Sequence, residues 1–237
     1  MKTDPDQIIK KRKQNCSKRN LAVTDQAMEN ISDVTVEECT KSRYLAPMRL
    51  KYKQNKEDKC WDLISEHDDV AVLLFNKSTD SFIFVRQFRP AIYLNNSKTE
   101  QKNDEVIIDT DKFPGSLGIT YELCAGLIDK DVSPTEIAKM EIHEECGFDV
   151  PMESIEHVTS YRSGVGTTGS KQYLFYAEVT EEMRTGKGGG VVEEGEMIDV
   201  IEIPKSEVMT FVMDENINRP IGMMFAVLWY FQNKTKS

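Results

Sequence analysis

Three acidic side chains, Glu141, Glu144 and Glu145, recur at helical spacing in the segment IAKMEIHEECGF. An α-helix turns once every 3.6 residues, so positions i, i+3 and i+4 share one face and three carboxylates gather there. A hard divalent cation relieves their repulsion, because Mg²⁺ takes oxygen ligands from carboxylates, waters and substrate phosphates. The spacing therefore indicates a magnesium site, whereas a solvated acidic helix face is the alternative for the same pattern in isolation.

A second acidic group follows later in the chain, in the glycine-flanked segment GGGVVEEGEM, which contains Glu193, Glu194 and Glu196. Glycines allow backbone turns that other residues avoid, and a strand is predicted directly afterwards, over residues 197–203. We therefore interpret this segment as a loop that can close over the same metal ions.

The first acidic group lies on the helix that the sequence predicts most clearly, over residues 134–146. Ser133 is a preferred N-cap residue, a proline follows it, and Glu136 stands three residues after the cap. Gly147 is expected to end the helix. A strand predicted over 120–124 and a short loop precede the helix, so strand, loop and helix together position the carboxylates.

Short apolar or alternating runs, separated by turn residues, predict further strands from about residue 44 onward. Residues 94–118 are polar, acidic and longer than an ordinary connection, which favours an exposed functional or disordered loop. The predicted strands cover 48–54, 60–65, 70–75, 82–88, 120–124, 155–161, 172–179 and 197–203, and two more helices are predicted over 205–211 and 220–231.

The chain divides into three parts by composition. Residues 1–43 are polar, contain a basic run and show no sustained hydrophobic period, so we expect a flexible tail. The basic run is interpreted as a solvated leader, with a nuclear address or a nucleic-acid arm as the alternative. Residues 44–68 form a strand region, and residues 69–237 form the main domain.

Overall composition restricts the partners and the compartment. Of the 237 residues, 30 are Lys or Arg and 40 are Asp or Glu, and this net charge of −10 disfavours binding to a long nucleic acid. No apolar stretch approaches the roughly 20 residues that span a bilayer. The five cysteines are scattered and form no CxxC pair, so we expect free thiols and a cytoplasmic location.

The string GLIDKDVSPTEIAKMEIHEECGF resembles the Nudix box, G-x5-E-x7-R-E-U-x-E-E-x-G-U, in length and in its loop–helix–loop layout. Two positions depart from the box, since Val132 replaces its first Glu and Met140 replaces its Arg. Neither change removes a metal ligand that the resemblance implies. Loss of the arginine does remove a charge-assisted partner of the carboxylates, which weakens the expectation of full activity.

The resemblance extends from about residue 44 to the C-terminus, and the chain is similar to the UDP-glucose pyrophosphatase branch of the Nudix superfamily, which is related to the ADP-ribose pyrophosphatases. The segments that carry it are YLAPMRLKYKQN, VAVLLFN, VRQFRPAIY, ELCAGLID, SGVGTTGSKQ, FYAEVT and GGGVVEEGE. The resemblance implies an α/β (α+β) fold, an α/β/α sandwich with a mixed sheet and N-terminal strands that form a homodimer. It also implies a hydrolase that splits UDP-glucose into UMP and glucose 1-phosphate with Mg²⁺, or Mn²⁺ as a second choice.

The resemblance also implies roles for individual residues. Glu141, Glu144 and Glu145 match the metal ligands of the box, and Ala125 matches a residue whose backbone carbonyl binds a metal. Glu194 and Glu196 match two loop acids, of which one is a metal ligand and the other the base for the attacking water, and we favour Glu194 as the base. These assignments make Glu144, Glu145, Glu194 and Glu196 the expected catalytic residues.

Two arginines are the expected substrate contacts. Arg89 matches an arginine that contacts the pyrophosphate. Arg86 is a weaker candidate, with an ordinary strand-surface charge as the alternative. The glycine-rich segment SGVGTTGSKQ is either a ligand-binding backbone or a tight turn, and Trp61 either stacks on a uracil base or a dimer partner, or simply packs within its strand.

Two rival functions remain at this point. Hydrolysis of ADP-ribose to AMP and ribose 5-phosphate would use the same catalytic residues, and the box cannot separate it from UDP-glucose hydrolysis. A binding module that holds a nucleotide sugar without cleaving it is suggested by Val132 and Met140.

Overall fold

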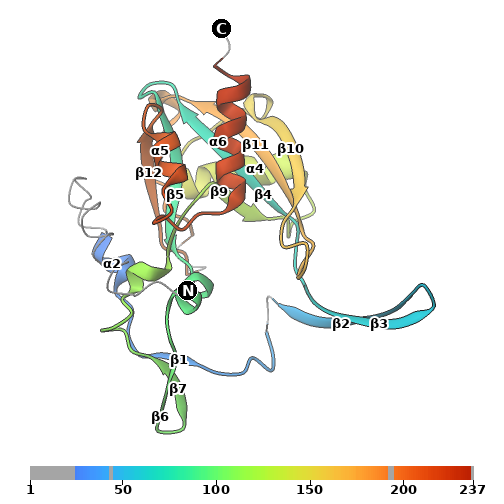
Figure 1. Ribbon diagram of the computed structural model, residues 1–237. Helices are drawn as coiled ribbons and strands as arrows, with labels where there is room; N and C mark the ends of the chain where they lie inside the picture. The colour runs from blue at the N-terminus through green and yellow to red at the C-terminus, as the bar shows by residue number, and fades with distance from the viewer. Residues whose placement is uncertain (1–24, 43–44, 192–194, 236–237) are drawn as a thin grey trace.

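The computed structural model of the chain describes residues 25–42, 45–191 and 195–235. The basic run, Cys16, Glu193 and Glu194 lie outside the described residues. The main body is layered around one large sheet. A three-stranded sheet and a long hairpin extend from this body (Figure 1).

The central sheet has seven strands in the order β10-β11-β4-β5-β12, with β8 paired to β5 and β9 paired to β4. The strands are β4 (Asp69–Asn76), β5 (Ser81–Phe88), β8 (Ile119–Glu122), β9 (Cys124–Leu127), β10 (Glu156–Arg162), β11 (Lys171–Val179) and β12 (Ile198–Pro204). Strands β4 and β11 are parallel, and the other pairs are antiparallel. The predicted mixed sheet is confirmed.

Helices cover both faces of this sheet (Figure 1). Helix α4 (Pro134–Cys146) packs on one face, and α5 (Val208–Met213) and α6 (Ile221–Asn233) pack on the other. Two single turns of 3-10 helix, η2 (Met152–Ser154) and η3 (Glu181–Met183), lie in the connections. The predicted α/β/α sandwich is confirmed, and α5 begins and ends slightly later than the sequence indicated.

Strand β4 shows why the sheet is buried on both sides. Its sequence, DVAVLLFN, is apolar almost throughout, which is typical of a strand covered on both faces. Because side chains alternate along a strand, Val70, Val72 and Leu74 pack towards α4, whereas Ala71 and Leu73 pack towards α5 and α6. The core therefore consists of two apolar layers, one on each side of the sheet.

Helix α4 has the predicted bounds because its end signals are local. The Ser133 hydroxyl accepts a hydrogen bond from the backbone N–H of Glu136, whose carboxylate accepts one from the N–H of Ser133, forming a capping box. Gly147 ends the helix with a φ of 75°, in the left-handed region that glycine adopts at little cost. The helix is thereby fixed at both ends relative to β9 and to the following loop.

The inner strands β4 and β5 diverge along their length. They pair only from Leu74 to Asn76, and beyond this point β9 pairs with β4 while β8 pairs with β5. This wedge places Ala125 opposite Ala71 and places Glu122 opposite Val85. The carboxyl end of β5, where Arg89 follows, therefore pairs with β8, and the chain continues from β8 directly into β9.

The prediction of a loop over residues 94–118 is wrong, although most of residues 94–105 are exposed as expected. This region contains the end of α3 (Pro90–Asn96), the strands β6 (Glu100–Lys102) and β7 (Glu105–Ile108), and the 3-10 turn η1 (Gly115–Gly118). Ile108, Phe113 and Leu117 are buried and pack with Tyr93 in a third apolar cluster. These apolar side chains are few and irregularly spaced in a polar stretch, so no period reveals them.

The expectation of a flexible tail is wrong for the part of it that is described. Residues 25–42 contain α2 (Asp25–Glu29) and β1 (Val34–Val36), and β1 pairs with β7 to complete the three-stranded sheet. Met28 of α2 is buried, with 4% of its surface exposed. The sequence did not predict these two elements, because a three-residue strand is too short to show a hydrophobic period.

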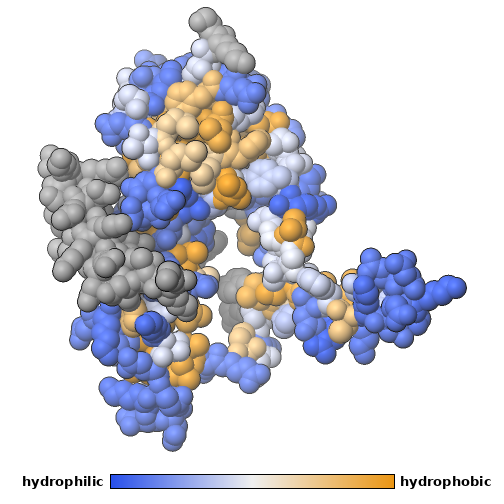
Figure 2. Space-filling model, in the orientation of Figure 1, coloured by the Kyte–Doolittle hydropathy of each residue, from blue (hydrophilic) through white to orange (hydrophobic). Residues whose placement is uncertain are grey.

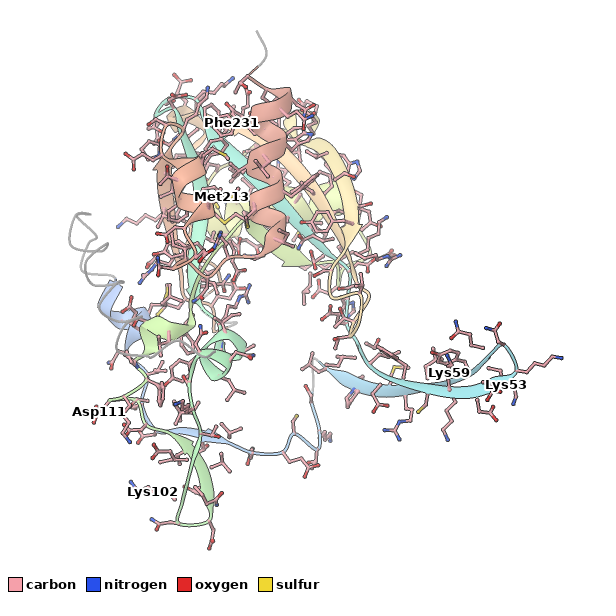
Figure 3. All side chains as sticks on the ribbon, viewed as in Figure 1. Lys53, Lys59, Lys102, Asp111, Met213 and Phe231 are labelled. Carbon is pink, nitrogen blue, oxygen red and sulfur yellow. The ribbon has the colours of Figure 1, made fainter. Side chains whose placement is uncertain are left out.

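A two-stranded hairpin, β2 (Ala46–Gln54) and β3 (Glu57–Ser65), projects from the body (Figures 1 and 2). Asn55 and Lys56 have φ of 54° and 69°, as expected for a two-residue hairpin turn with both residues left-handed. Lys53 and Lys59 project near this tip (Figure 3).

The base of the hairpin is tied to the turn between β10 and β11. The indole N–H of Trp61 donates to the carbonyl of Gly166 at 2.9 Å, and the backbone N–H of Ile64 donates to the carbonyl of Thr167 at the same distance. The segment SGVGTTGSKQ contains the connection between β10 and β11, in which the N–H groups of Thr167 and Thr168 donate to the carbonyl of Gly164. Trp61 is hydrogen-bonded to this segment while 54% exposed.

The free thiols that the sequence predicted are found wherever the structure describes a cysteine. Cys39 and Cys60 are exposed, and Cys124 and Cys146 are buried. Across the described ranges, every helix is too short or too polar to cross a membrane.

Candidate active site

The α4 carboxylates, Glu141, Glu144 and Glu145, lie where α4 packs against β9. Glu145 is buried, with 4% exposed, and its Oε2 accepts a hydrogen bond of 2.9 Å from the backbone N–H of Ala125. Glu141 and Glu144 are half-buried, and a Cβ atom at Gly126 would overlap the carboxylate of Glu141. The structure therefore brings the carboxylates of Glu141 and Glu145 together with the backbone of Ala125 and Gly126.

Burial and mutual repulsion both disfavour ionisation of these carboxylates. Burial raises the pKa of Glu145 to about 8, and the charges of Glu141 and Glu196 act in the same direction. Burial likewise raises the pKa of Glu141 to about 7, assisted by the charges of Glu144 and Glu196. Acidic side chains thus share a poorly solvated region, where a cation would favour their ionised form.

The glycine-rich segment before the second acidic group caps the end of α4. The N–H of Gly189 donates to the carbonyl of Glu145 at 2.9 Å, and the N–H of Gly190 donates to the carbonyl of Glu144 at 3.2 Å. Gly188 has a φ of 67°, and a Cβ atom there would overlap the carbonyl group of Glu145. Only glycine fits this close approach, and the acidic loop is thereby held beside the α4 carboxylates.

Glu196 is the predicted loop acid that the structure describes. Its Oε2 accepts a hydrogen bond of 2.8 Å from the backbone N–H of Val191, and its charge acts on Glu141 and Glu145 as described above. Glu194, which we favoured as the base, lies outside the described residues, together with Glu193.

The donor atoms at this site suit a hard divalent cation. They are carboxylate and backbone oxygens, which Mg²⁺ and Mn²⁺ prefer, rather than thiolate or imidazole groups. Among the described residues, no three His, Cys, Asp or Glu side chains converge as a ready-made metal-binding group. The crowding of charge that raises the pKa values of Glu141 and Glu145 nevertheless fits a site that a cation would complete.

Arg89, the predicted substrate contact, follows directly after β5 and forms a bidentate pair with Glu122 of β8. Its Nε and Nη2 donate to the two carboxylate oxygens at 2.9 and 2.8 Å. The hydroxyl of Thr120 donates to Oε1 of the same carboxylate at 2.6 Å. The hydrogen bonds to Glu122 raise the pKa of Arg89, and the charges of Glu145 and Glu196 act in the same direction. Arg89 is therefore electrostatically coupled to the α4 carboxylates.

Arg86, the weaker candidate, is buried rather than exposed on the strand surface. Only 4% of its side chain is accessible, and its guanidinium donates to Glu29 at 2.5 Å and to Asp199 at 2.8 Å. Asp199 lies opposite Arg86 in the pairing of β12 with β5. Arg86 thus links α2 to the central sheet.

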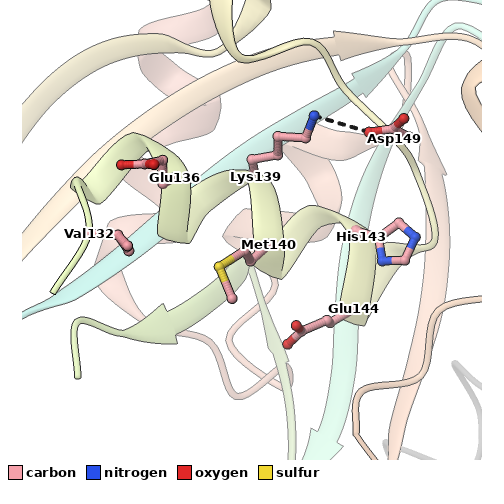
Figure 4. A pocket seen from close by; sticks show the side chains of 7 residues that line it. All are labelled: Val132, Glu136, Lys139, Met140, His143, Glu144 and Asp149. Atoms are coloured by element: carbon pink, nitrogen blue, oxygen red, sulfur yellow. Dashed lines mark ion pairs between the residues drawn. The ribbon is translucent and has the colours of Figure 1, made fainter. Parts of the chain in front are cut away.

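The two departures from the box line a shallow hollow, Met140 from α4 and Val132 from the loop before it (Figure 4). Met140 is half-buried there and Val132 is exposed, and Lys139 pairs with Asp149 at 3.2 Å. The hollow is lined by Val132, Glu136, Lys139, Met140, His143, Glu144 and Asp149. Of these residues, Glu144 alone belongs to the α4 carboxylates, so the hollow borders their site without containing it.

Sequence reasoning missed Glu122 and Thr120. The available signal was an acidic residue between apolar neighbours in the predicted strand TYELC, because a buried carboxylate requires a partner. The sequence does not show that the partner of Glu122 is Arg89, because the two residues meet only through the pairing of β8 with β5.

Comparisons with known proteins show that the chain is similar to several nucleotide-sugar pyrophosphatases. It is 42% identical over 212 residues to the uridine diphosphate glucose pyrophosphatase NUDT14 of Bos taurus, covering 86% of this chain and 96% of the relative. The protein of the same name from Mus musculus is 39% identical over 212 residues, with the same coverage. A GDP-mannose pyrophosphatase of Pectobacterium atrosepticum is 32% identical over 150 residues, covering 63% of this chain and 66% of the relative. No family model matches the chain.

Proposed function

The chain belongs to the Nudix hydrolase family, and on this premise we propose that it hydrolyses the pyrophosphate bond of UDP-glucose. Water and UDP-glucose give UMP and glucose 1-phosphate. The observation that carries the proposal is the crowded carboxylate group of α4 beside the backbone of Ala125 and Gly126. Similarity over nearly the full length of a UDP-glucose pyrophosphatase supports the choice of substrate.

The carboxylates of Glu141, Glu144, Glu145 and Glu196, with the backbone carbonyl of Ala125, are proposed to hold Mg²⁺, or Mn²⁺ as a second choice. When bound, such a cation neutralises the charge of the pyrophosphate and lowers the pKa of a coordinated water. Buried carboxylates with raised pKa values support this assignment, because a cation lets them ionise together.

Other residues are proposed to handle the substrate and the proton. Arg89 presents its half-exposed guanidinium to the pyrophosphate and makes a charge-assisted contact. Glu194 takes the proton of the attacking water, with Glu196 as the alternative base. Arg86 keeps the weaker assignment as a substrate residue, and its buried pairs with Glu29 and Asp199 favour a supporting role.

A homodimer formed through the hairpin of β2 and β3 is also proposed. One face of the hairpin is apolar: Leu50 lies opposite Trp61 and Met48 lies opposite Leu63. Leu50 and Trp61 are each 54% exposed, and such a surface on a projecting element favours burial against another protein. The opposite face carries ion pairs such as Arg49 with Asp62. We further propose a cytoplasmic location, which the free thiols support.

The experiment that tests the function is product analysis by chromatography. Purified protein with Mg²⁺ is offered UDP-glucose, ADP-ribose and GDP-mannose in parallel, the last because of the bacterial relatives. Glu144→Gln and Glu145→Gln are the test variants, and Glu207→Gln, an exposed glutamate before α5, is the control. We expect UMP to form fastest and to vanish in both test variants only.

Other outcomes would redirect the assignment. AMP or GMP as the better product would keep the mechanism and change the substrate. Absence of any product, with UDP-glucose still raising the melting temperature, would favour the binding module that Met140 and Val132 suggest.

A further inference from the structure

The Arg89 guanidinium has one edge held and one edge free. Its Nε and Nη2 donate to the carboxylate of Glu122, while Nη1 has no hydrogen-bond partner in the part of the chain that the structure describes. The Arg89 side chain is 48% exposed, whereas that of Glu122 is only 11% exposed. The pair therefore presents free N–H donors outward from a buried acceptor.

Glu122 is itself held in place from two directions. Strand β8 pairs with β5, so the backbone of Glu122 lies opposite Val85. Thr120, two residues earlier on the same face of the strand, donates its hydroxyl to Oε1 of Glu122 at 2.6 Å. Burial tends to raise the pKa of Glu122, but the hydrogen bonds from Arg89 and Thr120 keep it below its usual value. The carboxylate is thus a fixed, ionised acceptor.

The Arg89–Glu122 pair is linked to the candidate metal site through the chain itself. Glu122 stands three residues before Ala125, whose backbone N–H donates to Glu145, and the charge of Arg89 interacts with those of Glu145 and Glu196. On α4 itself, Met140 occupies the position where the family box has an arginine. The pair with Glu122 therefore makes Arg89 a cation whose orientation is set before the substrate arrives.

We propose that Glu122 is a positioning residue, which holds the guanidinium of Arg89 so that its free edge contacts the pyrophosphate of the substrate. The inference rests on the proposed function, because it assigns Arg89 to the pyrophosphate. Glu122 does not touch the substrate. It limits the conformations of the Arg89 side chain in the free protein, so that less conformational entropy is lost when the substrate binds.

The test compares Glu122→Gln with Glu181→Gln. Glu181 also forms a bidentate pair, with Arg184 at 2.8 and 3.0 Å, so its variant controls for the loss of such a pair elsewhere. We expect Glu122→Gln to raise the KM for UDP-glucose by about 10-fold or more while kcat changes by less. The Mg²⁺ concentration for half-maximal activity should stay the same, and Glu122→Asp, which keeps the charge, should raise KM less than Glu122→Gln.

A double-mutant cycle separates positioning from general stabilisation. In the Arg89→Ala background, Glu122→Gln should have little further effect on KM, because the residue that it positions is gone. Additive effects of the two changes, or an unchanged KM in a folded Glu122→Gln protein, would overturn the inference. Thermal unfolding of every variant identifies a protein that has simply lost its fold.

Binding of UDP to the same variants, measured by calorimetry with Mg²⁺, distinguishes the two proposals. If the wild-type chain binds UDP but hydrolyses no nucleotide sugar, the proposed function fails, and weaker UDP binding by Glu122→Gln would still support the positioning role. If the wild-type chain binds no UDP and forms no product, both proposals fall. An unchanged dissociation constant in Glu122→Gln would overturn the positioning role alone.

Discussion

Gly126 is the residue whose missing side chain leaves room for a proposed metal ligand. The carboxylate of Glu141 occupies the space where a Cβ atom at residue 126 would stand. A larger residue must therefore displace a proposed metal ligand, rather than merely strain a turn.

Gly126→Ala should lower kcat/KM and raise the Mg²⁺ concentration for half-maximal activity, each by about 10- to 100-fold, because a displaced ligand weakens metal binding. Gly166→Ala is the matched control, since a Cβ there meets no atom within 4 Å. Steady-state kinetics over a range of Mg²⁺ concentrations would measure both effects. If Gly126→Ala kept wild-type metal dependence, Glu141 would not be a ligand held against β9.

At the residue scale, sequence alone identified the residues whose relations are local. Glu141, Glu144 and Glu145 share a face because helical spacing dictates it, and Ala125 and Arg89 followed from the family resemblance. Glu122 was missed because its partner is 33 positions away, and only strand pairing brings the two together. The alternative interpretation of Arg86 as a strand-surface charge is wrong. The sequence could not show this, because the carboxylates that pair with Arg86 come from α2 and β12.

At the scale of elements, the capping box of α4 supports the helix that carries the carboxylates. Ser133→Ala removes the hydroxyl that accepts the N–H of Glu136 and should lower the free energy of unfolding by about 1 kcal/mol. Urea unfolding would measure the loss, with Ser206→Ala, an exposed serine before α5, as the control. Equal stability of the two variants would show that the cap contributes nothing.

The hairpin of β2 and β3 is the element on which the proposed dimer depends. Leu50→Lys introduces a charge on its apolar face and should shift the chain from twice 27.1 kDa towards the monomer mass, because a buried unpaired charge is costly. Lys51→Gln, on the opposite face, should leave the mass unchanged. Light scattering measures both, and a monomeric wild-type chain would contradict the dimer.

Elements were predicted well where their signals lie within the element. The Ser133 cap and Gly147 set the bounds of α4, and the nearly continuous apolar runs of β4 and β5 mark central strands. Strands β1, β6 and β7 were missed because they are three or four residues long, and their stability comes from one another and from a small apolar cluster. No window of the sequence contains both β1 and β7.

At the scale of the whole molecule, the layered architecture followed from the family resemblance, but the position of the site did not follow from the sequence. The residue patterns predicted individual strands and helices, which the resemblance arranged as helices on both faces of one sheet. The divergence of β4 and β5, which places β8 and β9 between them, depends on the three-residue extent of their pairing. Because of that divergence, the strands that carry Glu122 and Ala125 lie between β4 and β5.

The stability of the whole molecule should depend on pH through the buried carboxylates. The folded-state pKa values are raised to about 8 for Glu145, about 7 for Glu141 and about 6 for Asp69. Burial is the main cause in each case, so the folded chain binds more protons than the unfolded chain between about pH 4.5 and 8. Stability contributed by the protonated forms is therefore present at low pH and is lost as pH rises through this window.

The melting temperature of the metal-free protein should accordingly fall from pH 5 to pH 8, and Glu145→Gln, which cannot ionise, should fall less. Mg²⁺ binds the ionised carboxylates, so the increase in melting temperature that it causes should be larger at pH 8 than at pH 6. Calorimetry with and without a chelator measures both effects. Asp69→Asn is the control, since it removes a buried carboxylate outside the proposed ligand set and should leave the effect of Mg²⁺ intact. A stabilisation by Mg²⁺ that did not vary with pH would contradict the assignment of Glu141 and Glu145 as ligands, because their ionisation is the step that the cation must drive.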